Sequence, residues 1–413
     1  MRLATPAAHH DAGVCEHCEN RALCGAGRGK LWYTDAMKSM TAKRIAALLI
    51  ALLLSLALAA ACAPATGTPG ATAAPSGSAA SAVALLPETT ATPTPASQPT
   101  AAPDPLRPPE GAYTIAWLSD TQHYSRKYPL IYLDQTAFLK QEAGRLNLAY
   151  VVHTGDLVHN REDEAQWAVA DEAMRTLDGI PYGVCAGNHD VGTQADDCDY
   201  TYFSRYFGEA RMAGRPWYGG SYADNRGHFD LIDAGGTRYV FVYLGYHVDR
   251  DGLDFVNETL AAYPDRVGVL CVHSYFDHDC TLTDQGELLY DAVVAKNPNL
   301  YLVLCGHRYN SACVPATFDD DGDGTAERTV LQMICNYQAA GHTGGDGYLR
   351  LLQVDERAGE IHILTYSPLH DDFVYYDTPE HQAENYAFSP EGEQGSVPIP
   401  WPMDAAASTS GAG

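Results

Sequence analysis

Short apolar runs recur along the chain between residues 111 and 377, and polar or amphipathic stretches separate them. Runs that are apolar along their whole length are typical of strands buried on both faces. The strands predicted in this way cover residues 113–118, 149–152, 182–186, 267–272 and 300–305. Between some of them, residues 134–146 and 164–177 repeat apolar side chains at helical spacing. This alternation predicts an α/β domain with a largely parallel sheet.

Two further pairs of strands are predicted as hairpins. Residues 228–232 pair with 238–244, and residues 348–354 pair with 360–366, each across a turn that contains glycine. Two mixed sheets packed together, with helices outside them, accommodate both patterns. The predicted fold class is therefore α/β, as a four-layer α/β/β/α sandwich of two mixed β-sheets flanked by helices.

A long apolar segment precedes this domain. Lys38, Lys43 and Arg44 lead into residues 45–61, which end in small residues before Cys62. That order is typical of an export signal, and the final Leu-Ala-Ala-Ala-Cys resembles a bacterial lipobox. We therefore expect residues 37–62 to be an export signal with Cys62 as a lipid-bearing N-terminus. The alternative is a retained membrane-spanning helix, because the apolar run approaches the required length.

These segments divide the chain. An export signal should begin near the N-terminus, so residues 1–36 are interpreted as a non-native upstream extension, and their C-x-x-C motif is not assigned to a metal. Residues 63–109, rich in Ala, Thr and Pro, are predicted to be a disordered tether. The main domain is predicted to span 110–377, before a polar tail at 378–413. This organisation indicates a domain held by a lipid anchor at Cys62 on the outer face of a bacterial cytoplasmic membrane.

Composition limits the partners of the domain. The 413 residues are 46% hydrophobic and 19% charged, which is typical of a globular protein. A formal net charge of -26 argues against nucleic acid as a stable partner, because nucleic acids are polyanions. A small phosphate ester remains compatible, since a bound metal ion inverts the local field.

Every predicted buried strand runs directly into polar residues that can bind metals. Ligands in open α/β sheets bind beyond the carboxyl ends of the strands, so we expect these loops to converge. The candidate metal ligands are Asp120, Gln122, Asp156, Asn188, His273 and His307. This mixture of carboxylate, amide and imidazole groups suits Mn, Fe or Zn. A carboxylate can also bridge two ions about 4 Å apart, the spacing that serves phosphoryl transfer.

In this order the motifs resemble those of the calcineurin-like metallophosphoesterases, whose pattern is D-x-H, GD, GNHD, a later histidine, and GHxH. The resemblance covers residues 113–366. It implies that Asp156 bridges two divalent metal ions, with Asp120 and Gln122 on the first. The second ion would then be held by Asn188, His273 and His307.

The resemblance also implies the catalytic residues and the reaction. His189, held by Asp190, would contact the phosphate and assist the leaving oxygen. The expected activity is hydrolysis of phosphate mono- or diesters by a metal-bound hydroxide. The second hypothesis is a surface binding domain that keeps the fold and has lost catalysis.

The chain departs from the family pattern at the first metal. Gln122 stands where the family has a histidine, and Tyr309 stands in place of the second histidine of GHxH. If the segment after His307 is extended, Tyr309 points to the same side, because side-chain direction alternates along a strand. The phenol could then be protonated and unbound, bind Fe³⁺ as phenolate, or leave the position to water. We expect water and a weaker first site.

Four further features lie outside this set of residues. Asp319, Asp321 and Asp323 resemble the start of a Ca²⁺ loop, although Val330 occupies the twelfth position, or they form an acidic hairpin turn. Loop cysteines at 198, 280 and 313 could form disulfides in an exported protein. The loops at 215–222, 274–279 and 336–345 could line a pocket or lie on the surface, and His153 and His159 are expected to be core or rim residues.

Overall fold

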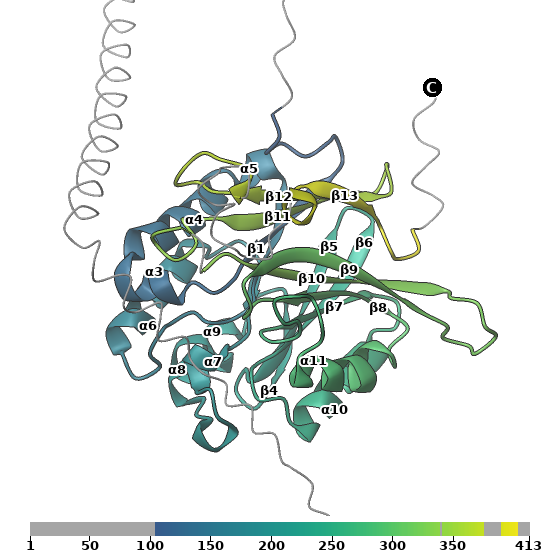
Figure 1. Cartoon of the computed structure of the whole chain (residues 1–413), viewed down its shortest axis with the longest axis horizontal. Coiled ribbons are helices and arrows are strands. Elements are labelled where there is room, and N and C mark those ends of the chain that lie inside the picture. Colours follow the sequence, from purple (N-terminus) through teal and green to yellow (C-terminus); the bar gives the residue numbers. More distant parts are fainter. Residues whose placement is uncertain (1–103, 339–340, 376–389, 404–413) are drawn as a thin grey trace, which may run out of the picture. The chain divides into compact units, whose positions relative to one another are not determined.

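The computed structural model describes residues 104–338, 341–375 and 390–403 (Figure 1). The predictions for residues 1–103, including the export signal and Cys62, lie outside the described residues. The strands are β1 (Tyr113–Leu118), β2 (Leu148–His153), β3 (Tyr182–Val184), β4 (Tyr218–Tyr222), β5 (Gly227–Ala234), β6 (Thr237–Leu244), β7 (Val267–Val272), β8 (Leu300–Cys305), β9 (Asn310–Phe318), β10 (Arg328–Asn336), β11 (Leu349–Asp355), β12 (Glu360–Tyr366) and β13 (Gly395–Pro398).

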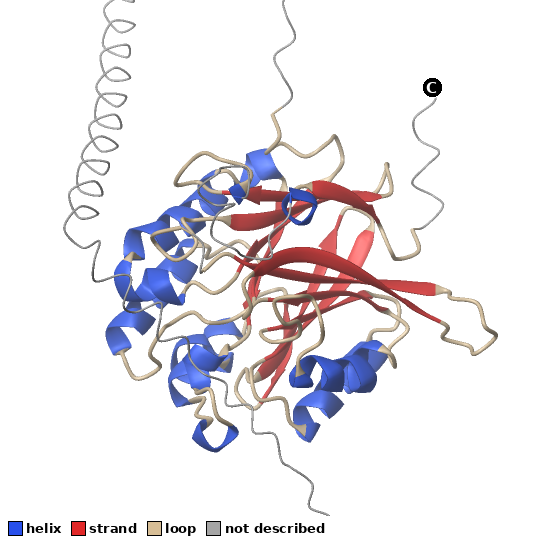
Figure 2. Ribbon diagram, in the orientation of Figure 1, coloured by secondary structure: helices blue, strands red, loops and turns tan. Residues whose placement is uncertain are grey.

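Most of the helices lie outside the sheets (Figure 2). They are α3 (Gln122–Lys127), α4 (Pro129–Gln141), α5 (Ala143–Leu146), α6 (Glu164–Thr176), α7 (Asn188–Val191), α8 (Thr201–Phe207), α9 (Glu209–Met212), α10 (Arg250–Ala262), α11 (Asp284–Leu289) and α13 (Pro390–Glu393), with shorter turns η1 (Ala195–Asp197) and η2 (Tyr290–Val294). In the described part of the chain, no helix has the length and apolar character needed to cross a membrane.

The strands form two mixed sheets. The order in the first is β13-β12-β11-β1-β2-β3, and the order in the second is β4-β5-β6-β7-β8-β10-β9. Strands β1, β2 and β3 run parallel to one another, and so do β6, β7, β8 and β10. Both predicted hairpins are present, as β5–β6 and β11–β12.

Three separate apolar cores hold four layers together. The first, which includes Val151 and Trp167, joins one face of the β1–β3 sheet to α4 and α6. The second lies between the two sheets and includes Trp117 and Phe241. The third joins the outer face of the other sheet to α10 and α11, and it contains Val242. The predicted α/β/β/α sandwich is confirmed, and the two helical layers lie on opposite sides in Figure 1.

One predicted helix differs from the observed one. The prediction covered 134–146, whereas α4 begins at Pro129 and ends at Gln141, and α5 follows as a separate turn. Proline favours the first turn of a helix because its missing N–H would be unpaired there. Asn147, at φ 45°, ends α5 in the left-handed conformation that commonly terminates helices.

The folded region extends beyond both predicted domain boundaries. Asp104 forms an ion pair with Arg145 at 2.6 Å, within the segment assigned to the tether. On the other side, β13 pairs with β12, and Trp401 is buried. Residues 390–403, which were predicted as part of a polar tail, therefore contribute an edge strand to the first sheet. A short edge strand of this kind limits pairing with other chains.

Candidate metal centre

The strand ends converge because β1, β2 and β3 in one sheet, and β7 and β8 in the other, present their carboxyl ends at the same side of the sandwich. The chain turns sharply as it leaves three of these strands. Asp120, Asp156 and His307 have φ values of 54°, 57° and 70°. Such left-handed conformations are uncommon for residues with a side chain, and they concentrate at functional sites.

Two glycines allow these turns to approach one another. A Cβ at Gly187 would collide with the carboxylate of Asp156, and a Cβ at Gly306 would collide with the carboxylate of Asp120. The glycines of the GNHD and GH motifs are therefore required by close packing around the two acidic side chains.

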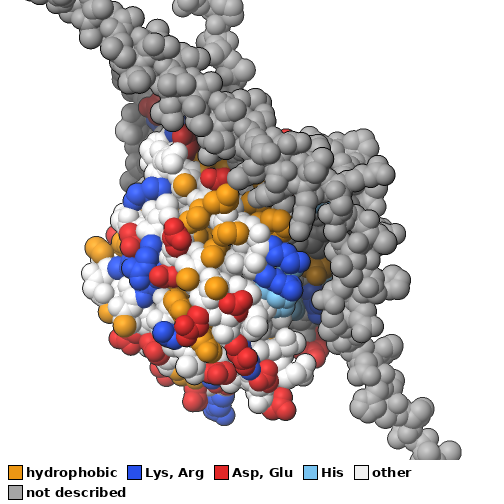
Figure 3. All heavy atoms as spheres, turned by 90° about the vertical axis from the view of Figure 1, so that its left-hand side faces the viewer, with side chains coloured by type: hydrophobic (Ala, Val, Ile, Leu, Met, Phe, Trp, Pro, Cys, Tyr) orange, Lys and Arg blue, Asp and Glu red, His pale blue; other side chains and the backbone are white. Residues whose placement is uncertain are grey.

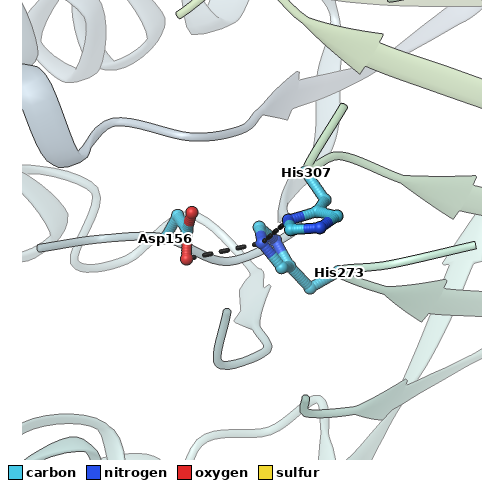
Figure 4. Close-up of side chains that lie close together, drawn as sticks. All are labelled: Asp156, His273 and His307. Carbon is cyan, nitrogen blue, oxygen red and sulfur yellow. Dashed lines mark hydrogen bonds and ion pairs between the residues drawn. The ribbon is translucent and has the colours of Figure 1, made fainter. Parts of the chain in front are cut away.

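Four of the candidate ligands meet at one buried point (Figure 4). His273 Nε2 lies 3.0 Å from Asn188 Oδ1, 3.2 Å from His307 Nδ1 and 3.4 Å from Asp156 Oδ1. Asp156 and His273 are almost completely inaccessible to solvent, with 1% and 0% exposure. In Figure 4 the carboxylate of Asp156 and the two imidazoles point toward one another from different loops.

Two oxygen atoms, from Asn188 and Asp156, face the imidazole of His273. Its Nδ1 lies 2.8 Å from the carbonyl of Thr154, which can only accept, so Nδ1 carries the hydrogen. In a neutral ring Nε2 then has a lone pair, and it faces the oxygens of Asn188 and Asp156. Acceptors in such contact repel unless a proton on Nε2 or a metal ion lies among them. Ligands about 2.1 Å from one ion would be separated by about 3.0–3.4 Å, so the observed spacing fits a divalent metal.

The pKa values of His273, Asp156 and Asp120 also reflect the charges at this site. Burial acts to lower the pKa of His273, but the carboxylate of Asp156 outweighs it and raises this pKa to about 9. For Asp156, burial acts to raise the pKa, whereas the imidazole of His273 lowers it below the usual range. Burial raises the pKa of Asp120 to about 7. The site thus favours a positive charge near Asp156.

Asp120 and Gln122 lie on the other side of Asp156. The amide Nε2 of Gln122 lies 3.1 Å from Asp156 Oδ2. Asp120 Oδ2 accepts the backbone N–H of His307 at 3.1 Å, which joins the first strand end to the last. All six predicted ligands are therefore brought together, in two groups that share Asp156.

Gln338 is a site residue that the sequence interpretation missed. It follows β10, and its amide contacts both Gln122 and the Asp120 Oδ1 atom, the latter at 3.3 Å. The loop at 336–345 had been recognised as a candidate pocket lining. Because β10 runs parallel to β8, the rule that placed His307 at the site applies equally to the end of β10 and would have found Gln338.

The support of His189 differs from the prediction. The Asp190 carboxylate accepts backbone N–H groups of Gly187 at 2.8 Å and Val158 at 3.0 Å. The imidazole of His189 instead lies with Nδ1 2.9 Å from the carbonyl of His159. The expectation that Asp190 holds the imidazole is corrected: a fully buried carboxylate satisfies backbone donors that fix the GNHD turn, and His159 orients the ring.

The segment after His307 is not extended, so the alternation invoked for Tyr309 does not apply. His307 has φ 70°, and residues 307–309 form a bend. The centroid of the Tyr309 ring lies 5.3 Å from the centroid of the His278 ring. The direction of the Tyr309 side chain therefore does not follow from its position two residues after His307.

Aromatic and imidazole rings surround the two groups of ligands. Tyr246, which follows β6, has its ring centroid 6.0 Å from His273 and 5.9 Å from His307. His159 stacks on His189 at 4.9 Å, whereas His153 is a buried core residue, as expected. Tyr246 was missed, although it too lies just beyond the carboxyl end of a strand.

A cavity of about 290 Å³ borders the ligands. Its lining includes His159, Arg161, Asn188 and His189. The face of the molecule drawn in Figure 3 has Lys and Arg side chains in separate groups among Asp and Glu, rather than a continuous basic surface. The charged residues that line the cavity are Arg161, Glu162 and Asp197.

The acidic loop lies apart from these residues, in the turn between β9 and β10. Possible ligand oxygens of Asp319, Asp321, Asp323 and Glu327 lie within 4.8 Å of one another, and all four residues are exposed. The Asp319 carboxylate accepts turn N–H groups of Gly322 and Gly324 at 2.7 and 2.8 Å. The acidic hairpin turn is confirmed, and calcium binding there stays a prediction.

The cysteines of the described residues are all free. Cys198 and Cys280 lie in loops, as predicted, whereas Cys313 is part of β9 rather than a loop. The loop at 215–222 likewise contains β4. These assignments leave the metal-ligand candidates as the main cluster of reactive groups.

The fold and site define a class of protein: an α/β/β/α domain with a metal-binding cluster at the edge shared by its two sheets. The particular family follows from a family model, that of the calcineurin-like phosphoesterases, which matches residues 113–311. The domain belongs to the calcineurin-like phosphoesterase family.

The individual relatives either share little sequence identity with this chain or match it over only part of their own length. The chain is 44% identical over 273 residues to the uncharacterized protein YvnB of Bacillus subtilis, a match that covers 66% of this chain and 21% of that protein. The chain thus spans about a fifth of this curated relative. A purple acid phosphatase from yellow lupin matches with 10% identity and a TM-score of 0.43, covering 64% of this chain and 52% of the lupin chain. A dimetal phosphatase from Danio rerio matches with 12% identity and a TM-score of 0.40, covering 64% and 99%.

Proposed function

We propose that the domain hydrolyses small phosphate mono- or diesters with the help of two divalent metal ions. Asp156 would be shared by both ions, Asp120 and Gln122 would hold the first, and Asn188, His273 and His307 would hold the second. The observation that carries this proposal is the spacing of 3.0–3.4 Å between His273 Nε2 and the atoms of Asn188, His307 and Asp156 around it, which fits ligands of one divalent ion.

Two divalent ions in such a site act as Lewis acids toward the phosphoryl group and lower the pKa of the attacking water. The residues of the chain orient the reactants. The carbonyl of Thr154 fixes the His273 tautomer, as carbonyls commonly do for metal-binding histidines. Asp190 fixes the turn that carries Asn188 and His189 through its bonds to Gly187 and Val158.

His189 is the proposed proton donor to the leaving oxygen. Its Nδ1 donates to the carbonyl of His159, so Nε2 is the nitrogen available to a substrate. The His189 side chain also lines the 290 Å³ cavity beside the ligands. A positioned acid of this kind typically contributes about a hundredfold or more to the rate.

A hydrolysis screen tests the proposal. Aryl mono- and diesters of phosphate and a panel of nucleotides would be incubated with protein that has been stripped of metal and reloaded with Mn²⁺, Fe²⁺, Zn²⁺ or Ca²⁺. Turnover that depends on added metal and is lost on chelation supports the enzyme. Metal binding without turnover of any ester favours the binding domain that keeps only the fold.

We also propose that the domain is exported and attached to the outer face of the membrane through lipid on Cys62. The sequence before Cys62 supports this, since basic, apolar and small residues follow in the order of an export signal. Cys62→Ser should release the protein from the membrane fraction or block its processing. A variant that stays membrane-bound and unshortened would instead indicate an uncleaved helix.

A further inference from the structure

The carboxyl end of β10 supplies a side chain to the half of the site where two family histidines are missing. Gln338 lies two residues beyond Asn336, the last residue of β10, and its backbone N–H donates to the Asn336 side chain at 2.8 Å. This bond holds the turn that directs the Gln338 amide toward Asp120. Because β10 is the parallel neighbour of β8, Gln338 and His307 reach the site from adjacent strand ends.

Two amides connect the two carboxylates. Gln338 Nε2 lies 3.3 Å from Asp120 Oδ1, Gln338 Oε1 accepts from Gln122 Nε2, and Gln122 Nε2 lies 3.1 Å from Asp156 Oδ2. The N–H groups thus occupy the positions between carboxylates that a cation would otherwise fill. Gln122 is 1% exposed, and its Oε1 is buried without a hydrogen-bond partner.

That buried oxygen indicates how the amides are used. An unpartnered buried carbonyl oxygen is unfavourable. Rotation of an amide by 180° exchanges its oxygen and nitrogen with little change in shape. In the rotated form, Gln122 and Gln338 both direct oxygen toward the carboxylates, which repels unless a cation is present. A metal ion bound between these oxygens would remove the repulsion and take both amide oxygens as ligands.

The two halves of the site then have different donor chemistry. Around Asp156 and His273 the donors include two imidazoles, which suit Zn or Fe. Around Asp120 the donors are all oxygens, from two carboxylates and two amides. Oxygen ligands of this kind suit Mg²⁺, Ca²⁺ or Mn²⁺.

We propose that Gln338 is a ligand of the first metal and that, with Gln122, it makes this site an all-oxygen site selective for a hard divalent ion. The proposal rests on the proposed function for the existence of the dinuclear centre, and it assigns the identity of the ion and of one ligand. Gln338 would then bind the first metal in place of the second histidine of the GHxH motif, a position that Tyr309 holds in this chain.

The test measures metal binding rather than turnover. The purified full chain, stripped of metal, would be titrated with Mn²⁺ and with Zn²⁺ in separate chelator-competition experiments, with Mn²⁺ also followed by electron paramagnetic resonance. The variants are Gln338→Met, which keeps the volume of the side chain, and Gln338→His, which supplies an imidazole. Gln353→Met is the matched control, because Gln353 lies on β11 and donates to the carbonyl of Pro105.

We expect wild type to bind one Zn²⁺ tightly and to prefer Mn²⁺ at the other site. Gln338→Met should weaken Mn²⁺ binding by about 10–100-fold, the range seen when support of a metal site is lost, and leave the tight Zn²⁺ unchanged. Gln338→His should shift the preference of the first site from Mn²⁺ toward Zn²⁺. The control should bind both ions as wild type does.

The outcomes separate this inference from the proposed function. Thermal unfolding of Gln338→Met shows whether the variant is folded. If it is folded and binds Mn²⁺ like wild type, Gln338 is not a ligand. A wild-type first site that prefers Zn²⁺ to Mn²⁺ also overturns the proposal. If the metal results are as expected and no ester is hydrolysed, the all-oxygen site stands and the proposed hydrolase does not.

Discussion

The two halves of the site are built differently, although they share Asp156. On one side, His273 and His307 contact each other at 3.2 Å, and the carbonyl of Thr154 fixes the tautomer of His273. On the other side, the amide of Gln338 contacts both Asp120 and the amide of Gln122. An imidazole held by its second nitrogen is a preorganised ligand, whereas an amide can turn either atom toward its neighbour. The half around His273 should therefore hold metal tightly, and the half around Asp120 should exchange it.

The largest effect is expected from the residue that belongs to both halves. Asp156→Asn removes the negative charge that both ions share, so metal content and activity should fall together, with activity lower by roughly a hundredfold to a thousandfold. Metal analysis of the purified variant and turnover measurements check this. Full turnover with both ions retained would exclude a dinuclear centre bridged by Asp156.

His273→Ala and Gln122→Ala distinguish the halves directly. His273→Ala should release the tightly bound ion, whereas Gln122→Ala should affect only the readily exchanged one. Each loss should amount to about 10–100-fold in affinity at the affected site. Equal losses at both sites in both variants would mean that the halves act as one site, and the comparison between them would fail.

His189→Ala should leave both halves loaded and slow the reaction. We expect kcat to fall by about a hundredfold or more with an alkyl ester, because that leaving oxygen needs a proton. The fall should be smaller with a nitrophenyl ester, whose leaving group needs less protonation. His362→Ala, on β12, provides a control for the loss of a histidine. Equal losses for the two esters would argue against a role at the leaving oxygen.

The sequence predicted the strands and their polar ends well, because strands buried on both faces leave an unambiguous apolar pattern. The same rule located Asp120, Asp156 and His273 at one edge. The rule failed where the direction of a side chain depended on a backbone turn. The left-handed conformation of His307 bends residues 307–309, and no local pattern revealed that bend.

Other parts of the site depend on contacts between distant segments. The bond from His189 to the carbonyl of His159 joins residues 30 positions apart. The contact of Gln338 with Asp120 joins residues 218 positions apart. Strand order in the second sheet, where β10 lies between β8 and β9, makes the latter contact possible. Neither contact follows from the composition of its own loop.

The smallest effect is expected at Tyr309. Its ring contacts His278, in a loop beside the site, and Gln338 reaches Asp120 from a different strand. Tyr309→Phe keeps the ring and should change metal affinity by less than about 0.5 kcal/mol, the usual range for a substitution away from key contacts. Tyr309→His should likewise leave the first site selective for Mn²⁺. The same chelator-competition titrations measure both variants. A coloured ferric protein whose absorption band disappears in Tyr309→Phe would show direct binding of the phenolate, and the oxygen-rich half would then include Tyr309.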